Sequence, residues 1–242
     1  MTQNVYDKED FFQNYSRLKR SVEGLAGAAE WPTIQALLPD MKGLSVLDLG
    51  CGFGWFCRWA RAAGAARVLG MDLSEKMLAR AVAETKDAAV AYERGDMERL
   101  ALPPASFDLV YSSLAFHYVV ALDRLFGEIH RALVPGGRFV FSVEHPLFTA
   151  PSRPQWTETG DGRIWPLDRY LDEGARSTDW LTKGVIKQHR TIGTYVNLLV
   201  ARAFTVAHVE EWGPSAGQIA AHPEWKHERD RPPFLIMAAR RI

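Results

Sequence analysis

The sequence has few cysteines and no excess of charge of either sign. Lys+Arg and Asp+Glu each number 29, so the formal net charge is zero. A surface of this kind exerts no general attraction on nucleic acid or on anionic membranes. Cys51 and Cys57 match no usual zinc spacing, and a disulfide between them across a tight turn is unfavourable. Composition therefore argues against a nucleic-acid partner, a zinc site and a disulfide scaffold.

Long apolar runs are also absent. No stretch reaches the length of a membrane span, and the first residues lack the pattern of a signal peptide. We therefore expect a cytoplasmic protein without a membrane partner, either a monomer or a homodimer. The 242 residues are 47% hydrophobic and 24% charged, which is typical of one globular domain. We predict a single domain over 1–242, with a helical cap at 1–44 and a substrate lid inserted at 146–189.

The most informative segment is residues 46–54, Val-Leu-Asp-Leu-Gly-Cys-Gly-Phe-Gly. An apolar run ends in an acid, and glycines follow at alternate positions. This pattern predicts a buried strand that turns sharply into a helix, because glycine adopts positive φ and lets a ligand approach the backbone. Turns of this kind, at the carboxyl ends of strands in open α/β sheets, bind nucleotide-like cofactors.

Two common nucleotide-binding loops are excluded at this turn. The dinucleotide fingerprint requires a third glycine where this chain has Trp55. The phosphate-binding loop requires a Gly-Lys-Ser/Thr sequence, which does not follow. Asp48 fits neither motif, and its position suits a carboxylate that faces a cationic group of a ligand.

Strand and helix patterns alternate from Ser45 onward, which favours a parallel sheet. An apolar stripe before this point predicts helices over 1–44. The expected strands are 46–49, 67–71, 89–92, 107–112, 138–143, 204–211 and 234–239, and the expected helices are 55–63, 74–83, 122–133 and 191–201. Residues 146–189 break the alternation, and a long irregular segment of this kind is usually functional. Its tryptophans, Trp156, Trp165 and Trp180, would form an aromatic wall for a substrate or simply pack the lid.

Further motifs follow the glycine loop in a fixed order. Asp72 ends the second strand, Gly95-Asp96-Met97 follows the third, residues 106–112 form the fourth, and Pro135-Gly136-Gly137 precedes the fifth. Together with the loop at 46–54, this set resembles the class I S-adenosylmethionine (SAM)-dependent methyltransferases.

The resemblance implies a fold and a cofactor. The fold is α/β and Rossmann-like, with a seven-stranded, mostly parallel sheet, an antiparallel edge strand 7, N-terminal helices, and an insertion between strand 5 and the last helix. The cofactor is S-adenosyl-L-methionine, with its ribose hydroxyls on the carboxylate of Asp72, its adenine near Met77 and Asp96, and its methionine part over the glycine loop. The implied cofactor-binding residues are Asp48, Gly50, Cys51, Gly52, Gly54, Asp72, Leu73, Met77, Asp96, Met97 and Ser112.

The chain resembles most the small-molecule branch, which includes ubiquinone- and menaquinone-biosynthesis methyltransferases. It lacks the Asn-Pro-Pro-aromatic element and the Pro-Cys nucleophile of nucleic-acid enzymes, and has Ser-Ser-Leu-Ala at 112–115 instead. We therefore expect methyl transfer to a small organic acceptor, at oxygen or nitrogen rather than carbon, without a metal. Two alternatives remain open, which are methylation of a protein or RNA and a regulatory SAM-binding subunit without chemistry of its own.

Candidate catalytic residues follow the fourth and fifth strands. His117 and Tyr118 come after the fourth strand and His145 closes the fifth, where ligands bind in these sheets. We predict catalytic roles for all three, with a histidine as the base for a hydroxyl or ammonium acceptor; structural roles are the alternative. Glu144 is expected to face away from the site, because strand residues alternate. Arg190 could bind a substrate carboxylate or phosphate, or form a surface ion pair.

Overall fold

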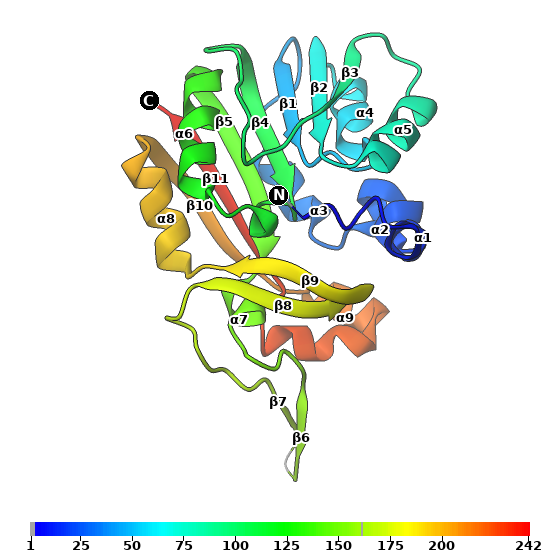
Figure 1. Cartoon of the computed structure of the whole chain (residues 1–242), viewed down its shortest axis with the longest axis vertical. Coiled ribbons are helices and arrows are strands. Elements are labelled where there is room, and N and C mark those ends of the chain that lie inside the picture. Colours follow the sequence, from blue (N-terminus) through cyan, green and yellow to red (C-terminus); the bar gives the residue numbers. More distant parts are fainter. Residues whose placement is uncertain (1–2, 161) are drawn as a thin grey trace.

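The computed structural model describes residues 3–160 and 162–242. Strands and helices alternate through most of the chain, as the sequence predicts (Figure 1). The elements are α1 (Glu9–Ser16), α2 (Lys19–Val22), η1 (Gly24–Gly27), α3 (Trp31–Leu37), β1 (Ser45–Leu49), α4 (Trp55–Ala62), β2 (Arg67–Asp72), α5 (Glu75–Glu84), β3 (Val90–Arg94), β4 (Phe107–Ser113), η2 (Phe116–Tyr118), α6 (Leu122–Ala132), β5 (Leu133–Glu144), α7 (Pro146–Thr149), β6 (Thr157–Thr159), β7 (Gly162–Ile164), β8 (Gly174–Trp180), β9 (Thr182–His189), α8 (Ile192–Ala201), β10 (Phe204–Trp212), α9 (Ala216–Ala221), η3 (Pro223–Arg229) and β11 (Phe234–Arg241).

The central sheet has seven strands in the order β10-β11-β5-β4-β1-β2-β3. The strands from β5 to β3 pair in parallel, whereas β11 is antiparallel to both β5 and β10. The mostly parallel sheet and the antiparallel pairing near one edge are confirmed. The edge position expected for 234–239 needs correction, because β11 lies one place inside and β10 is the outermost strand. Five consecutive residues of β11 are buried, which suits a strand paired on both sides, whereas β10 alternates.

Helices cover both faces of the sheet and divide the core into two main clusters (Figure 1). The first lies between the sheet and the helices α6 and α8, and the second between the sheet and α3, α4 and α5. All five residues of β1 are buried, as expected for a central strand covered on both faces. The ends of the central strands are thereby fixed in space, and the loops that follow them are supported by a rigid frame.

Two helix starts follow the expected capping chemistry. The Ser74 hydroxyl accepts a hydrogen bond from the Met77 N–H at the start of α5. The Thr191 hydroxyl accepts from the Thr194 N–H at the start of α8. Each side-chain oxygen satisfies a backbone donor that has no partner within its helix.

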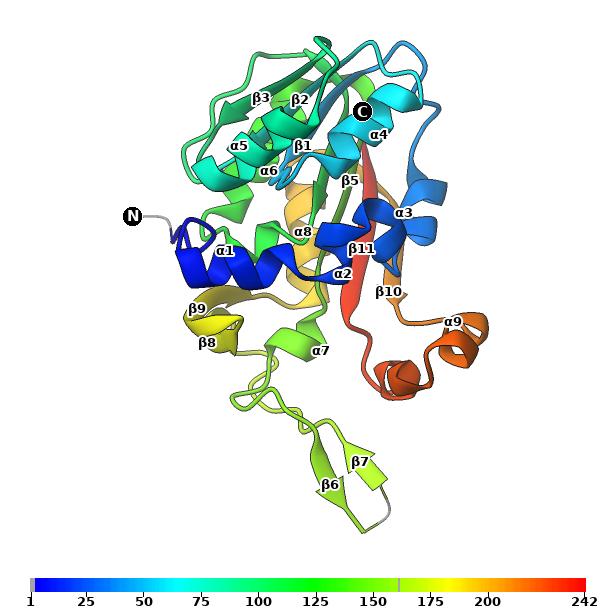
Figure 2. The same ribbon diagram turned by 90° about the vertical axis from the view of Figure 1, so that its right-hand side faces the viewer.

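The segment 146–189 contains two β-hairpins, which the sequence did not predict. The β6–β7 hairpin is exposed and projects from the body of the protein (Figures 1 and 2). The β8–β9 hairpin lies across the carboxyl ends of the sheet, close to the N-terminal helices (Figures 1 and 2). Only one residue of β8 is buried, so its strand pattern carries little of the apolar alternation by which strands are recognised.

The N-terminal segment and the β8–β9 hairpin pack against each other. Phe11 in α1 contacts Trp180 at the end of β8, with ring centroids 5.5 Å apart. Val5, Phe11 and Val185 form a small buried cluster of their own. The Gln3 side chain accepts a hydrogen bond from the Ile186 N–H. Two segments far apart in the sequence therefore cover the same end of the sheet together.

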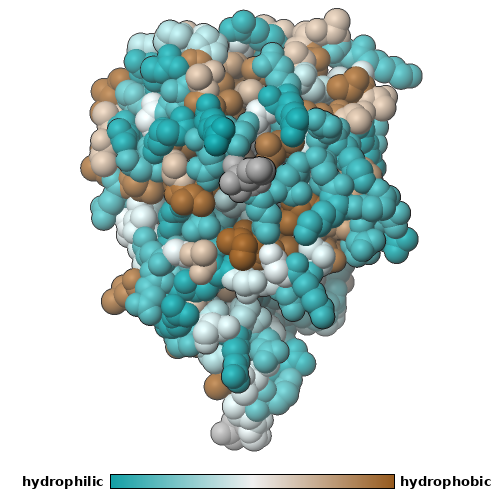
Figure 3. All heavy atoms as spheres, in the orientation of Figure 1, coloured by the Kyte–Doolittle hydropathy of each residue, from teal (hydrophilic) through white to brown (hydrophobic). Residues whose placement is uncertain are grey.

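Hydrophilic side chains predominate on the face of the molecule in Figure 3, with apolar residues scattered among them. None of the helices within 3–160 and 162–242 combines the length and the apolar character that a membrane span requires.

Candidate functional site

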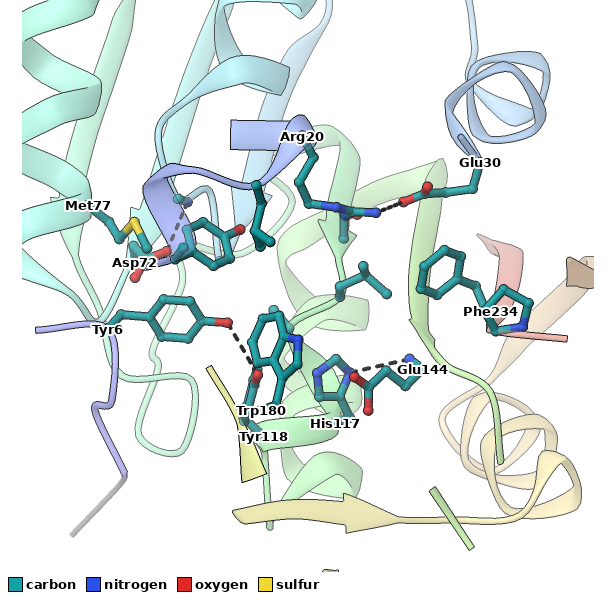
Figure 4. Close-up of a pocket in the computed structure, with 18 of the residues that line it drawn as sticks. Tyr6, Arg20, Glu30, Asp72, Met77, His117, Tyr118, Glu144, Trp180 and Phe234 are labelled. Atoms are coloured by element: carbon teal, nitrogen blue, oxygen red, sulfur yellow. Dashed lines mark hydrogen bonds and ion pairs between the residues drawn. The ribbon is translucent and has the colours of Figure 1, made fainter. Parts of the chain in front are cut away.

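A cavity of about 500 Å³ lies at the carboxyl ends of the central strands, beneath the N-terminal helices and the β8–β9 hairpin (Figure 4). One end is formed by the glycine loop and the ends of β2 and β3. The other is formed by η2, the end of β5 and the hairpin. Most of the site residues predicted from the sequence line this cavity: Gly50, Gly52, Asp72, Leu73, Met77, Asp96, Met97, His117 and Tyr118.

The glycines of the loop serve different purposes. At Gly50 a Cβ would lie 2.5 Å from the Ala115 Cβ, and at Gly54 it would lie 2.1 Å from the Tyr92 hydroxyl. Packing within the protein therefore requires glycine at both positions. Gly52, with φ +52°, lines the cavity, and a Cβ there would meet no protein atom within 4 Å. Gly52 leaves the cavity side of the loop open to a ligand.

Asp72 ends β2 with its side chain on the cavity. Its carboxylate accepts hydrogen bonds of 2.9 Å from the Gly52 N–H and the Ser74 N–H, which fix its orientation and tie it to the glycine loop. Burial raises the pKa of this carboxyl, and the two backbone donors oppose the shift. An ionised carboxylate has further lone pairs, which suit the two hydroxyls of a ribose.

Beyond Asp72 the cavity has apolar walls and one further acid. Leu73, Met77 and Met97 provide the apolar side chains, and Met77 is almost completely buried. Asp96 lines the same part of the cavity. A slot of this composition suits a flat aromatic ring that carries an amino group.

Four of the predicted cofactor residues lie outside the main cavity and support the loop from behind. These are Asp48, Cys51, Gly54 and Ser112. The Asp48 carboxylate accepts from the Cys57 thiol at 3.3 Å, and burial raises the pKa of Asp48 to about 7. The Ser112 hydroxyl donates to the Leu49 carbonyl at 2.7 Å, which ties β4 to β1. Their contacts hold the strand ends and the loop in place.

His145 does not line the cavity. His145 is fully buried and caps the start of α7, where its Nδ1 accepts from the Leu147 N–H at 3.1 Å. Its Nε2 lies 3.0 Å from the Glu211 carboxylate. Both ring nitrogens are therefore engaged away from the site. This geometry supports a structural turn role rather than the predicted catalytic one.

His117 lies on the cavity as a buried, neutral ring. Its Nδ1 accepts from the Glu144 N–H at 3.4 Å, which places the ring proton on Nε2. Burial, together with the nearby cations of Lys187 and Arg190, holds the pKa of His117 well below its usual range. The ring is suited to donating a hydrogen bond into the cavity, and poorly suited to the general-base role predicted from the sequence.

The pH dependence of stability tests this assignment of His117. The folded pKa lies below the unfolded value of about 6.5, so the unfolded chain binds the extra proton as the pH falls. The stability that the neutral ring contributes is present above about pH 6.5 and is lost below it, by at most about 1.4 kcal/mol per pH unit. We expect the stability advantage of the wild type over His117→Gln to narrow between about pH 7.5 and about pH 5.5. Urea unfolding measures it, and a constant or growing advantage would show that the ring becomes protonated in the fold.

Tyr118 lines the cavity with Tyr6 beside it. The Tyr6 hydroxyl donates to the Tyr118 oxygen at 3.3 Å. Burial raises the pKa of both phenols well above the ordinary value, so both are neutral hydrogen-bond donors.

Glu144 faces the cavity, contrary to the expectation that it points away (Figure 4). Its Oε1 binds the Nζ of Lys187 in β9, whose side chain is only 2% exposed. Its Oε2 is buried and has no hydrogen-bond partner among the residues that the structure describes. Strand residues alternate as predicted, but the turn into α7 takes His145 away and leaves Glu144 on the cavity side. Had the cavity-facing positions of β5 been assigned correctly, the alternation would have placed Glu144 on the cavity.

A second residue that the sequence did not reveal is Arg20 in α2. It lines the cavity near the glycine loop and pairs with the buried Glu30 at 2.8 Å. The surrounding sequence is polar and carries no motif, so nothing in it marked Arg20 as part of a site.

The aromatic wall and the arginine proposed for the insertion are only partly on the cavity. Trp180 lines it, but Trp156 and Trp165 pack around Arg231 instead. Arg190 donates to the carbonyls of Val119 and Val120 and does not line the cavity. Its guanidinium braces the loop after η2, which argues against a direct contact with substrate.

Comparison with known proteins agrees with this geometry. A family model described as a methyltransferase domain matches residues 47–141. A SAM-dependent methyltransferase of known structure from Mesorhizobium loti is 59% identical, with a TM-score of 0.87 over 90% of this chain and 100% of that chain. The chain belongs to the SAM-dependent methyltransferases. A related structure from Listeria monocytogenes is 40% identical, with a TM-score of 0.81 over 89% of this methyltransferase and 99% of that chain.

A curated relative with a named substrate matches less of this methyltransferase. The malonyl-[acyl-carrier protein] O-methyltransferase of Pectobacterium atrosepticum is 38% identical over 145 residues, which cover 59% of this chain and 56% of that protein. The chain therefore spans about half the length of this relative.

The cofactor of this methyltransferase is S-adenosyl-L-methionine, and the cavity fits it. The open side of Gly52 suits the amino-acid moiety of the cofactor, and the fixed carboxylate of Asp72 suits its ribose. The apolar slot at Met77 and Met97 suits its adenine.

Substitution of Gly52 separates ligand binding from folding. We expect Gly52→Ala to weaken the binding of S-adenosylhomocysteine about tenfold or more, because the new methyl occupies the ligand side of the loop. The matched control is Gly136→Ala, since Gly136 also has positive φ (+79°) and a methyl group there would meet no atom within 4 Å, but it lies in the exposed first part of β5, away from the cavity. Calorimetric titration and thermal unfolding of both variants measure the effect. Similar affinity losses in the two variants would refute the specific role of Gly52.

Proposed function

We propose that this enzyme transfers the methyl group of SAM to an oxygen or nitrogen atom of a small organic acceptor. The observation that carries the proposal is that one cavity is lined both by the cofactor-side residues, such as Gly52 and Asp72, and by Tyr118, Glu144 and Trp180. An acceptor beside these last three residues would share the cavity with the methyl donor.

The size and cover of the cavity support a small acceptor. Its volume of about 500 Å³ lies in the range of sites for single drug-sized ligands, and the cofactor has to occupy part of it. The N-terminal segment and the β8–β9 hairpin pack together above it. On this proposal the cap at 1–44 and the insertion at 146–189 belong to one domain and exclude water during the reaction.

The chemistry expected of the protein is mainly alignment. SAM supplies a methyl group that is already activated on a sulfonium sulfur. Gly50 and Gly52 would hold the methionine part, Asp72 the ribose, and Met77, Asp96 and Met97 the adenine. His117 and Tyr118 would donate hydrogen bonds that orient the acceptor. Because the acceptor and the methyl donor are then held side by side, the methyl transfer proceeds like a reaction within one molecule.

A second candidate acceptor is a carboxylate on a carrier protein. The malonyl-[acyl-carrier protein] O-methyltransferase relative supports it, and so do the neutral donors of His117 and Tyr118, because a carboxylate oxygen accepts hydrogen bonds and needs no base.

The test is acceptor-dependent formation of S-adenosylhomocysteine. The enzyme is incubated with SAM and either a low-molecular-weight metabolite extract, a malonyl-carrier protein, or bulk protein and RNA. We expect turnover with the metabolite extract, and mass spectrometry then identifies the methylated product. Turnover only with protein or RNA would contradict a small acceptor, whereas binding of the cofactor without turnover on any fraction would favour a regulatory subunit.

A further inference from the structure

We propose that the acceptor is an amine and that Glu144 binds its ammonium group and removes its proton. This inference rests on the proposed function, because it assigns the chemical class of the acceptor in the same cavity. It favours N-methylation over transfer to a carboxylate.

The position of Glu144 is the first observation. The residue ends β5, on the cavity side, and its side chain is 14% exposed. Lys187 binds Oε1 from outside the cavity lining, and Oε2 is buried without a hydrogen-bond donor among the described residues. A buried carboxylate oxygen without a donor is costly, and an N–H from an ammonium group would satisfy it with a charge-assisted hydrogen bond.

The charges around the cavity are the second observation. Its lining residues include six carboxylates and three cationic side chains. Each of these cations already has a carboxylate partner: Lys19 pairs with Glu23, Arg20 with Glu30, and Arg231 with Glu228. The described lining therefore has more carboxylates than cations and no cation without a carboxylate partner, while Lys187 and Arg190 lie just behind it. This excess of acid favours a cationic acceptor over a carboxylate or phosphate.

The aromatic residues near Glu144 are the third observation. Tyr118, Trp180 and Phe234 line this end of the cavity, and Figure 4 places all three around Glu144 and His117. The Trp180 ring already makes a cation–π contact with one ammonium group, since Lys187 Nζ lies 4.7 Å from the ring centroid. Aromatic faces beside a carboxylate are the usual surroundings of a bound amine.

Glu144 is also the group best suited to take the proton. His117 and Tyr118 are neutral donors, held so by burial, whereas the free oxygen of Glu144 is an acceptor. The ammonium N–H would pass its proton to Oε2, and the freed nitrogen lone pair would form the N–C bond. The C–S bond of the donor breaks, its electron pair stays on sulfur, and the proton leaves Glu144 for solvent with the product.

The test uses three ligands with one aromatic frame: 2-phenylethylamine, 2-phenylethanol and 3-phenylpropanoate. Each is titrated into the wild-type enzyme saturated with S-adenosylhomocysteine. We expect the amine to bind at least about tenfold more tightly than the alcohol, and the carboxylate to bind most weakly. This ranking needs only the wild type, so it remains decisive even if a variant folds poorly.

Substitution then assigns the preference to Glu144. We expect Glu144→Gln to weaken amine binding about 10- to 100-fold and to leave S-adenosylhomocysteine affinity unchanged. Glu93→Gln, which removes the same charge from the exposed surface of β3, serves as the control. Equal affinities for the three ligands, tighter binding of the carboxylate, or a Glu144→Gln variant with wild-type amine affinity would each overturn the inference while the proposed function stands. Failure of S-adenosylhomocysteine to bind would instead overturn the proposed function.

Discussion

Replacement of Asp72 by alanine is expected to weaken S-adenosylhomocysteine binding about 100-fold or more. Two effects combine in this loss. The carboxylate accepts from the Gly52 N–H and so fixes the glycine loop, and its remaining lone pairs face the part of the cavity assigned to the ribose. Hydrogen bonds to a charged group contribute about 1.5 to 3 kcal/mol each, so two of them account for at least about 3 kcal/mol.

A matched substitution distinguishes the loss of cofactor contacts from the loss of the local hydrogen bond that Asp72 accepts from the Ser74 N–H. Asp87 also accepts a hydrogen bond from the N–H two residues further on, that of Ala89, but lies on the surface away from the cavity. Asp87→Ala should therefore keep wild-type affinity in calorimetric titration. Unchanged affinity in a folded Asp72→Ala variant would refute the role of Asp72 in cofactor binding.

Replacement of Lys187 by methionine is expected to destabilise the protein by about 3 to 5 kcal/mol. Lys187 is 2% exposed and Glu144 is 14% exposed, so the substitution leaves a mostly buried carboxylate without its counterion. The cost comes mainly from the charge that remains, because methionine fills much of the space of the lysine stem. Urea unfolding near neutral pH measures the change in the free energy of unfolding.

The double variant Lys187→Met/Glu144→Gln identifies the source of this cost. Without the carboxylate no uncompensated charge remains, so the double variant should recover most of the lost stability. If the double variant is as unstable as Lys187→Met alone, the loss reflects packing around Trp180 rather than the ion pair.

The central strands and the cofactor end of the site could be predicted from sequence because their signals are local. A buried strand of a parallel sheet is a short apolar run, and an acid or glycine at its end marks the edge where ligands bind. Asp72 and Gly52 were predicted in this way, and both line the cavity. The same local motif does not reveal which of its members line the cavity. Asp48 and Gly54 lie behind the loop, where packing against Cys57 and Tyr92 decides their contacts.

The acceptor end was harder to predict because tertiary contacts build it. The alternation of strand residues predicts Glu144 and His145 on opposite sides, but the pattern alone does not say which side the cavity is on. Lys187 and Trp180 come from a hairpin whose strands have little apolar alternation. Their approach to Glu144 depends on how the hairpin docks over the sheet, which no local pattern specifies.

A crystal structure of the enzyme with S-adenosylhomocysteine would test the central claim most directly. We expect the ribose on Asp72, the adenine between Met77 and Met97, and the sulfur facing the space between Tyr118 and Glu144. A ligand whose sulfur faces away from Glu144, or one bound outside this cavity, would contradict the shared site for cofactor and acceptor.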